Sequence, residues 1–81
     1  MSARPVKHSV TLHGHRTSIS LEAPFWTELR RIAHEKSLPI NALVAEIDAA
    51  RGMDSGLASA IRVYVLEALR DRLPRSDQTN E

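Results

Sequence analysis

The stretch RTSISL, residues 16–21, alternates strictly between polar and apolar side chains, in a chain whose later segments have helical spacing. An alternation of period two is typical of a β-strand with one buried face and one exposed face. The polar positions are Arg16, Ser18 and Ser20, and the positions of the buried side are Thr17, Ile19 and Leu21. A lone strand leaves its backbone N–H and C=O groups without partners. The need for a partner strand therefore constrains the fold more than any other feature of the sequence.

The size of the chain suggests where this partner comes from. The protein has 81 residues and no cysteine, so disulfides and cysteine-based zinc sites are excluded. Chains this short usually need a staple, a metal or a partner subunit. The simplest partner is the same strand of a second copy, paired antiparallel about a two-fold axis. The sequence thus predicts an obligate homodimer with an intermolecular two-stranded ribbon.

Three later segments have the apolar spacing of amphipathic helices. Their expected bounds are residues 22 to 36 or 37 for the first, 39–51 for the second and 57–73 for the third. Gly52 is expected to cap the second helix and Pro74 to stop the third. The third helix is apolar nearly all round, which indicates burial on more than one side. The predicted fold class is mostly α with one β-strand.

Composition divides the chain into five parts. They are a basic N-terminal arm at 1–15, a core at 16–51, a linker at 52–56, the additional helix at 57–73 and a disordered tail at 74–81. Residues 10–13 alternate between apolar and polar side chains, so this piece either extends the strand or forms a separate extended segment. Gly14 interrupts the pattern and indicates a bulge or a bend.

Positive charge is concentrated before residue 22. Residues 1–21 contain Arg4, Lys7 and Arg16 and no acidic residue, giving +3, whereas residues 22–81 sum to −2. A polyanion would meet the N-terminal segment first, although a solvated arm without a partner has the same composition. No apolar run approaches the ~20 residues of a membrane span, and the N-terminus lacks a signal-peptide core. These features predict a cytoplasmic protein without membrane partners.

The exposed side of the predicted ribbon has the chemistry of a DNA reader. A two-stranded ribbon fits the major groove of B-form DNA, where alternate side chains reach base edges. An arginine suits guanine O6 and N7, and a serine donates or accepts with less discrimination. Arg16, Ser18 and Ser20 are therefore the predicted base contacts. The alternative is an ordinary solvent-exposed face of a strand.

The segment RTSISLEAPFWTELRRIAHEKSLPINALVAEI resembles the ribbon-helix-helix DNA-binding proteins of the Arc, MetJ and CopG type. The matching pattern is a strand, a helix of roughly 15 residues, a short turn and a second helix, at residues 16 to about 50. TLHGHRTSISLE, the following FW and IRVYVLEAL are similar to a smaller bacterial branch with an added third helix. The resemblance implies an intertwined homodimer that regulates transcription as a repressor or co-regulator and reads duplex DNA through Arg16, Ser18 and Ser20.

The resemblance also implies a phosphate contact at the start of the second helix, near Asn41, through backbone N–H groups. The family commonly has a glycine and then a serine or threonine here, but this chain has Ser37 and Pro39. Pro39 lacks an N–H group, so the contact shifts to Ile40 and Asn41. A cap role for Asn41 is the alternative. Further predicted phosphate contacts are Lys7, Arg4 and His15.

Other chemistry has less support. His13 and His15 would share one face of a strand, but the arm offers no third ligand, so no metal and no cofactor is expected. Phe25 is expected in the core, with Trp26 at its edge or against the partner chain. No arrangement of catalytic residues is present, which predicts a protein that is not an enzyme.

The apolar third helix suggests an alternative function. In it the same dimer is a protein-interaction module, like an antitoxin or an adaptor, that grips another protein through this helix. The helix would otherwise wrap the dimer or join dimers into a higher oligomer. DNA binding and protein binding can coexist in one molecule.

Overall fold

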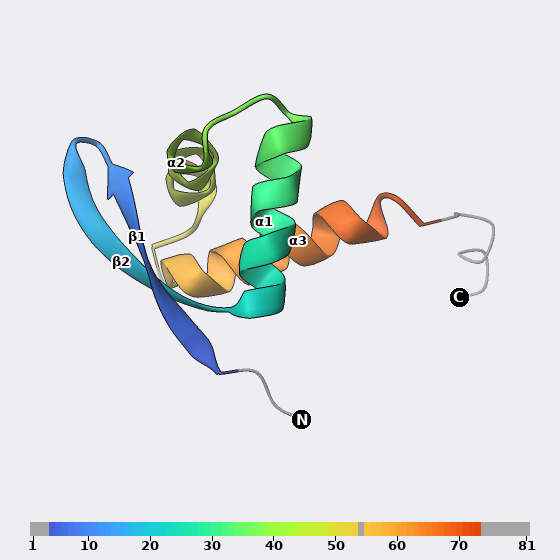
Figure 1. The fold of residues 1–81 in the computed structure, drawn as a ribbon, viewed down its shortest axis with the longest axis horizontal. Helices are drawn as coiled ribbons and strands as arrows, with labels where there is room; N and C mark the ends of the chain where they lie inside the picture. Colours follow the sequence, from blue (N-terminus) through green and yellow to red (C-terminus); the bar gives the residue numbers. More distant parts are fainter. Residues whose placement is uncertain (1–3, 54, 74–81) are drawn as a thin grey trace.

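The computed structural model describes residues 4–53 and 55–73, which form a two-stranded antiparallel sheet followed by three helices (Figure 1). The elements are β1 (Pro5–Leu12), β2 (His15–Glu22), α1 (Ala23–Glu35), α2 (Ile40–Ala50) and α3 (Leu57–Arg70). The sheet lies on one side of the helices, with β1 next to α2 and β2 running directly into α1 (Figure 1). The strand, the three helices and their order agree with the sequence-based expectation.

The expectation of a basic arm is wrong for residues 5–9, which belong to β1, whereas the alternative of a separate extended segment is confirmed for residues 10–12. A two-residue turn, His13–Gly14, joins β1 to β2, with φ angles of 51° and 80°. Positive φ at both central residues is the geometry of a type I′ turn, whose twist matches that of the flanking strands. Gly14 therefore lies in a hairpin turn, not in a bulge within one strand.

The partner of β2 in this structure is β1 of the same chain. Leu12 pairs with His15 next to the turn, and Pro5 pairs with Glu22 at the far end. The expectation that β2 has no partner strand within its own chain is therefore wrong for the edge of β2 that pairs with β1. The other edge of β2 has no partner strand among the described residues. The physical reason is that residues 6–12 also alternate, so they supply an inner row that continues the buried face of β2.

The core lies between the inner face of the hairpin and all three helices. Its buried side chains are Val10, Ile19, Leu21, Leu29, Ile32, Ala33, Leu43, Val44, Ile47, Ile61 and Val65. Leu29, Ile32 and Ala33 lie one helical turn apart, which is the stripe that α1 needs to cover the sheet. Each buried leucine, isoleucine or valine contributes roughly 1.5–3 kcal/mol relative to exposure, so the hairpin depends on the helices and the helices on the hairpin.

α3 buries one face within this chain and exposes the other. Ile61 and Val65 face the core, whereas Val63 is 53% exposed and Leu66 52% exposed. Arg62 fixes this orientation because its Nε donates to Glu22 Oε1 at 2.9 Å. The expected burial of α3 on a second side would require another chain, so it stays a prediction.

The helix ends differ in detail from the expectation. α2 begins after Pro39 and ends at Ala50, with Arg51 as its C-cap, so Gly52 lies one residue beyond the cap. The expected tail at 74–81 lies outside the described residues.

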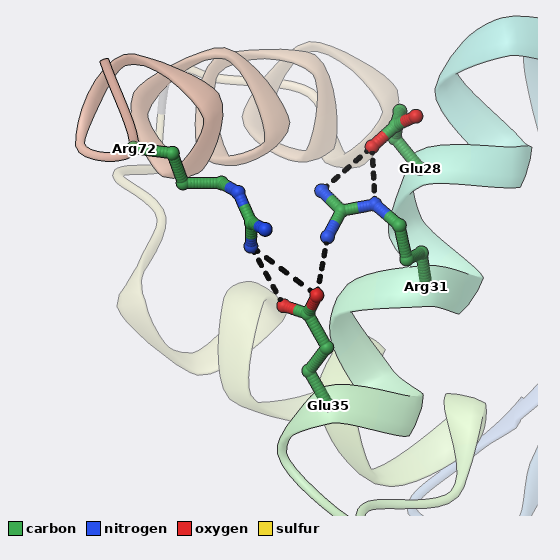
Figure 2. Close-up of polar contacts among 4 residues, drawn as sticks. All are labelled: Glu28, Arg31, Glu35 and Arg72. Atoms are coloured by element: carbon green, nitrogen blue, oxygen red, sulfur yellow. Dashed lines mark hydrogen bonds and ion pairs between the residues drawn. The ribbon is translucent and has the colours of Figure 1, made fainter. Parts of the chain in front are cut away.

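Ion pairs that are exposed or partly buried lie along α1, and one of them connects α1 with the segment after α3 (Figure 2). Arg31 lies between Glu28 and Glu35 on α1, with its Nε 2.7 Å from Glu28 Oε1. Arg72 Nη1 reaches Glu35 Oε1 at 3.0 Å. Surface ion pairs contribute little individually, so the pair of Arg72 with Glu35 adds little to the stability of the fold.

The end of α1 is closed by a Schellman motif without a glycine. Leu38 N–H donates to Ala33 O at 2.9 Å, and Ser37 N–H donates to His34 O at 3.0 Å. The motif places its C′ residue in the left-handed region, and Ser37 adopts a φ of 58°. A Cβ in this conformation costs about 1–2 kcal/mol, which glycine avoids.

We therefore expect Ser37→Gly to raise the free energy of unfolding by about 0.5–1 kcal/mol, after the greater chain entropy of unfolded glycine is subtracted. Urea denaturation followed by circular dichroism measures this change. Ser59→Gly, at an exposed position inside α3, is the matched control and should lower the free energy of unfolding by up to about 1 kcal/mol. Equal losses in both variants would contradict the role of Ser37.

Candidate nucleic-acid interface

The outward face of the hairpin carries six polar side chains in two parallel rows. Lys7, Ser9 and Thr11 form the β1 row, and Arg16, Ser18 and Ser20 form the β2 row. All six residues are exposed. The register pairs Lys7 with Ser20, Ser9 with Ser18, and Thr11 with Arg16. The rows therefore make one continuous polar surface opposite the core.

Burial of the inner face determines which residues point outward. Val10, Ile19 and Leu21 are each at most 3% exposed. A register slip by one residue would bring the outward rows into the core, so the apolar inner row holds both outward rows in place. The sequence predicted the β2 row and Lys7 but missed Ser9 and Thr11. The signal for them was the alternation of residues 6–12, which continues through a two-residue turn containing glycine.

The outward face is positive at two separated points. Arg16 lies beside the turn opposite Thr11, and Lys7 lies four residues further along β1, roughly 13 Å away along the strand. Neither strand has an acidic residue before Glu22. The face therefore offers a guanidinium, an ammonium and four hydroxyl groups with no carboxylate between them.

A hydrogen bond from Thr11 to Asn41 shows which backbone groups of the two strands point to the outer edges of the hairpin. Thr11 N–H donates to the Asn41 Oδ1 atom at 3.1 Å, so it points toward α2 and not toward β2. Thr11 and Arg16 therefore form a non-hydrogen-bonded pair, and this pattern recurs at every second pair of an antiparallel ladder. The same geometry thus applies to the pairs Ser9–Ser18 and Lys7–Ser20.

The outer edge of β2 consequently presents the N–H and C=O groups of Arg16, Ser18 and Ser20. Among the described residues, none outside the sheet forms a hydrogen bond with these groups. The outer edge of β1 is different because α2 lies against it. The outer edge of β1 is therefore bonded by α2 at its turn end, whereas the outer edge of β2 is open.

The start of α2 lies beside the turn end of β1. The Asn41 side chain does not cap the helix, since its amide oxygen Oδ1 accepts the hydrogen bond from the Thr11 N–H group. The expected cap role of Asn41 is thus wrong. The first N–H groups of α2 that form backbone hydrogen bonds are those of Ala42 and Leu43, which both donate to Pro39 O. The N–H groups of Ile40 and Asn41 have no partner among residues 4–53 and 55–73. A predicted phosphate contact at these two groups is compatible with this arrangement.

The remaining predicted contact residues are distributed around the hairpin. Arg4 is exposed and directly precedes β1. His15 is exposed but belongs to the inner row with Thr17, Ile19 and Leu21, so it lies on the other face from Arg16. His13 lies in the turn, with its Nε2 atom 3.8 Å from Asp48 Oδ2. The expected common face of His13 and His15 is therefore wrong, and the described part of the chain contains no group of three or more metal-ligand side chains.

An aromatic stack joins the hairpin to α1. His8 stacks on Trp26 with ring centroids 3.9 Å apart and an interplanar angle of 7°. Trp26 is half-buried against the core, as is Phe25. The expectation of Trp26 at the edge of the core is confirmed, whereas its stacking on His8 could not be read from the sequence. The stack joins β1 to α1 across the inner face.

Glu22 and Arg62 join the end of β2 to α3. The hydrogen bond from Arg62 holds the pKa of the Glu22 carboxyl below its ordinary value, because a donor that bonds the ionised form favours it. Arg62 also lies over the ring of Phe25, with its Cζ atom 5.9 Å from the centroid. These contacts give Arg62 a structural role that links α3 to the end of β2 and to α1.

Comparison with known families decides what this architecture is. A family model described as a ribbon-helix-helix domain matches residues 5–69. This chain belongs to the ribbon-helix-helix family. Comparison with curated proteins and with solved structures gave no match.

The match extends beyond the resemblance seen at residues 16–50, because it includes β1 and nearly all of α3. Ribbon-helix-helix proteins are in general DNA-binding transcription regulators or antitoxins, and they usually bind DNA as dimers. Their fold is not an enzyme fold. In the part of this ribbon-helix-helix chain that the structure describes, no helix has the length and apolar content to cross a membrane.

Proposed function

We propose that this ribbon-helix-helix protein is a homodimeric, sequence-specific regulator of transcription that reads the major groove of duplex DNA with the β2 strands of its two chains. The observation that carries the proposal is the position of the β2 row. Arg16, Ser18 and Ser20 are exposed on the outward face, and their backbone groups point to the open edge.

Dimerisation through the open edge is the first part of the proposal. The outward-pointing backbone groups are centred on Ser18, so two β2 strands can pair antiparallel about a two-fold axis at this residue. Each Arg16 then lies opposite Ser20 of the second chain. The pairing satisfies the backbone groups that a single chain leaves open and doubles the number of base-reading side chains.

Base recognition is the second part. The paired β2 strands form a ribbon that the major groove admits, about 12 Å wide. Arg16 donates two hydrogen bonds to guanine O6 and N7, and Ser18 and Ser20 contact neighbouring base edges. The two-fold axis implies a site with inverted symmetry, as in other dimeric DNA-binding proteins.

Phosphate contacts are the third part. The free N–H groups of Ile40 and Asn41 at the start of α2 suit an anionic oxygen. Lys7 and Arg4 add positive charge on the side of β1. His15, at the exposed end of the inner row, contacts phosphate only if the backbone of the DNA passes the turn.

Arg16→Ala should weaken binding to a preferred duplex by about 1–3 kcal/mol and relax the base preference, because a bidentate guanine contact is lost. Fluorescence anisotropy on duplexes selected by the unaltered protein, compared with a random duplex, measures both effects. Arg70→Ala removes the same charge at the exposed end of α3 and should leave the preference intact. An unchanged preference in Arg16→Ala would refute readout by the ribbon.

Ser18→Pro should abolish dimerisation without opening the hairpin. The Ser18 N–H group points to the open edge and not to β1, so proline removes a bond between chains only. We expect the variant to be monomeric by light scattering at micromolar concentration and to retain its far-ultraviolet circular dichroism. A dimer of unchanged mass would show that the chains do not pair through β2.

The alternative function is a protein-interaction module that uses α3. Its supporting observation is the exposure of apolar side chains, Val63 and Leu66 on α3 and Leu73 after its end, which are 52–59% exposed. α3 also contributes Ile61 and Val65 to the core, so deleting it would remove core residues along with the exposed face. Surface substitutions separate these two effects.

The double variant Val63→Ser, Leu66→Ser should keep the dimer mass and the DNA affinity of the unaltered protein, because both residues are more than half exposed and neither belongs to the buried core. Light scattering and anisotropy test this expectation. Loss of the dimer would instead assign the exposed face of α3 to self-association. Loss of DNA binding in an intact dimer would make α3 part of the DNA-binding assembly.

A further inference from the structure

The outward row of β1 has no role in the function proposed above beyond the charge of Lys7. We infer that Lys7, Ser9 and Thr11 form a phosphate-contacting row, so that each chain grips one sugar-phosphate backbone of the DNA while its β2 row contacts the bases. The inference rests on the proposed pairing of two β2 strands, and it assigns Ser9 and Thr11 to phosphodiester oxygens.

The argument begins with the order of the strands. Within one chain β1 pairs with one edge of β2, and α2 bonds to the outer edge of β1 at Thr11, beside the turn. The bond at Thr11 obstructs the turn end of the β1 edge, whereas no described residue outside the sheet bonds to the β2 edge, so the proposed pairing uses the β2 edge. Pairing there gives a four-stranded sheet with both β2 strands in the centre and both β1 strands outside.

The spacing of the strands then separates the two rows. Neighbouring strands lie about 4.8 Å apart, so the two β2 rows are about 4.8 Å apart and the two β1 rows about 14 Å apart. The major groove is about 12 Å wide. The central rows fit between its walls, whereas the outer rows lie over the walls, where the phosphates are.

The chemistry of the β1 row suits this position. Its members are one ammonium and two hydroxyl groups, which are common donors to phosphate oxygens and carry no sequence information there. The bidentate donor that suits a guanine edge, Arg16, is in the β2 row. The outer β1 row therefore carries donors suited to phosphates, and the central β2 row carries the donor suited to bases, as their distances from the centre of the groove require.

The start of α2 supports the same placement. Thr11 and Asn41 are joined by a hydrogen bond, so the free N–H groups of Ile40 and Asn41 lie on the same flank as the Thr11 side chain. Donors from β1 and from α2 thus converge on one side of each chain. A sugar-phosphate backbone of DNA that passes this flank meets hydroxyl, ammonium and amide donors in succession.

A rival arrangement places one hairpin alone in the groove. Both rows of that chain would then face bases, and Ser9 and Thr11 would influence the base preference. This arrangement leaves the backbone groups of Arg16, Ser18 and Ser20 at an open edge, which the paired arrangement satisfies. The two arrangements predict different effects of the same substitutions.

The experiment uses the full chain with Ser9→Ala, Thr11→Val and the double variant. Thr11→Val keeps the branched shape and the backbone bond to Asn41, and it removes only the hydroxyl. Thr27→Val and Ser59→Ala, at exposed positions of α1 and α3, are matched controls. The probes are a duplex selected from a randomised pool by the unaltered protein and a random duplex of equal length, each titrated across salt concentrations.

We expect each β1 substitution to weaken binding roughly three- to tenfold, by the same factor on both duplexes, with an unchanged ratio between them. The slope of log affinity against log salt should stay the same for these neutral side chains, whereas Lys7→Ala should reduce it by about 0.9. Arg16→Ala should instead lower the ratio. The controls should match the unaltered protein.

Two results would overturn the inference while leaving the proposed function standing. A changed ratio for Ser9→Ala or Thr11→Val would place the β1 row against bases. Unchanged affinity on both duplexes for the double variant would remove the row from the interface. If the unaltered protein bound neither duplex in a salt-dependent manner, the proposed function itself would fail, together with the inference.

Discussion

The structure depends on the backbone hydrogen bonding of β2. A strand has two edges, and each edge presents N–H and C=O groups that need partners. β1 supplies one set through a two-residue turn, and the bond from Thr11 to Asn41 shows which groups point the other way. The remaining open edge is centred on Ser18. The proposed dimer, its two-fold axis and the order of strands over the DNA all follow from this edge.

The two faces of the hairpin separate stability from recognition. Val10, Ile19 and Leu21 of the inner row are buried against the helices, and His8 of the same row stacks on Trp26. The outward rows make no contact with the core, so substitutions there change recognition with little effect on folding. Glu22 and Arg62 join the end of β2 to α3, which makes the third helix part of the fold of the single chain and more than an addition to a minimal ribbon-helix-helix domain.

Sequence patterns predicted most elements but missed the first strand. The alternation of RTSISL, the apolar stripes of the helices and the positions of the prolines gave β2 and the three helices to within a few residues. The sequence pattern does not indicate β1, because its inner row contains His8 and its turn uses His13 at a positive φ, a place where asparagine or glycine is the usual signal. Without β1, the outward row of Ser9 and Thr11 could not be recognised.

The sequence by itself determined the chemistry of the β2 row, because strict alternation sends Arg16, Ser18 and Ser20 to one face whatever the strand pairs with. It also determined the concentration of positive charge before residue 22. Only the tertiary structure decided which strand covers β2, which edge stays open, and that Asn41 bonds to a strand and does not cap its helix. These features depend on contacts between residues far apart in the chain, which local periodicity does not encode.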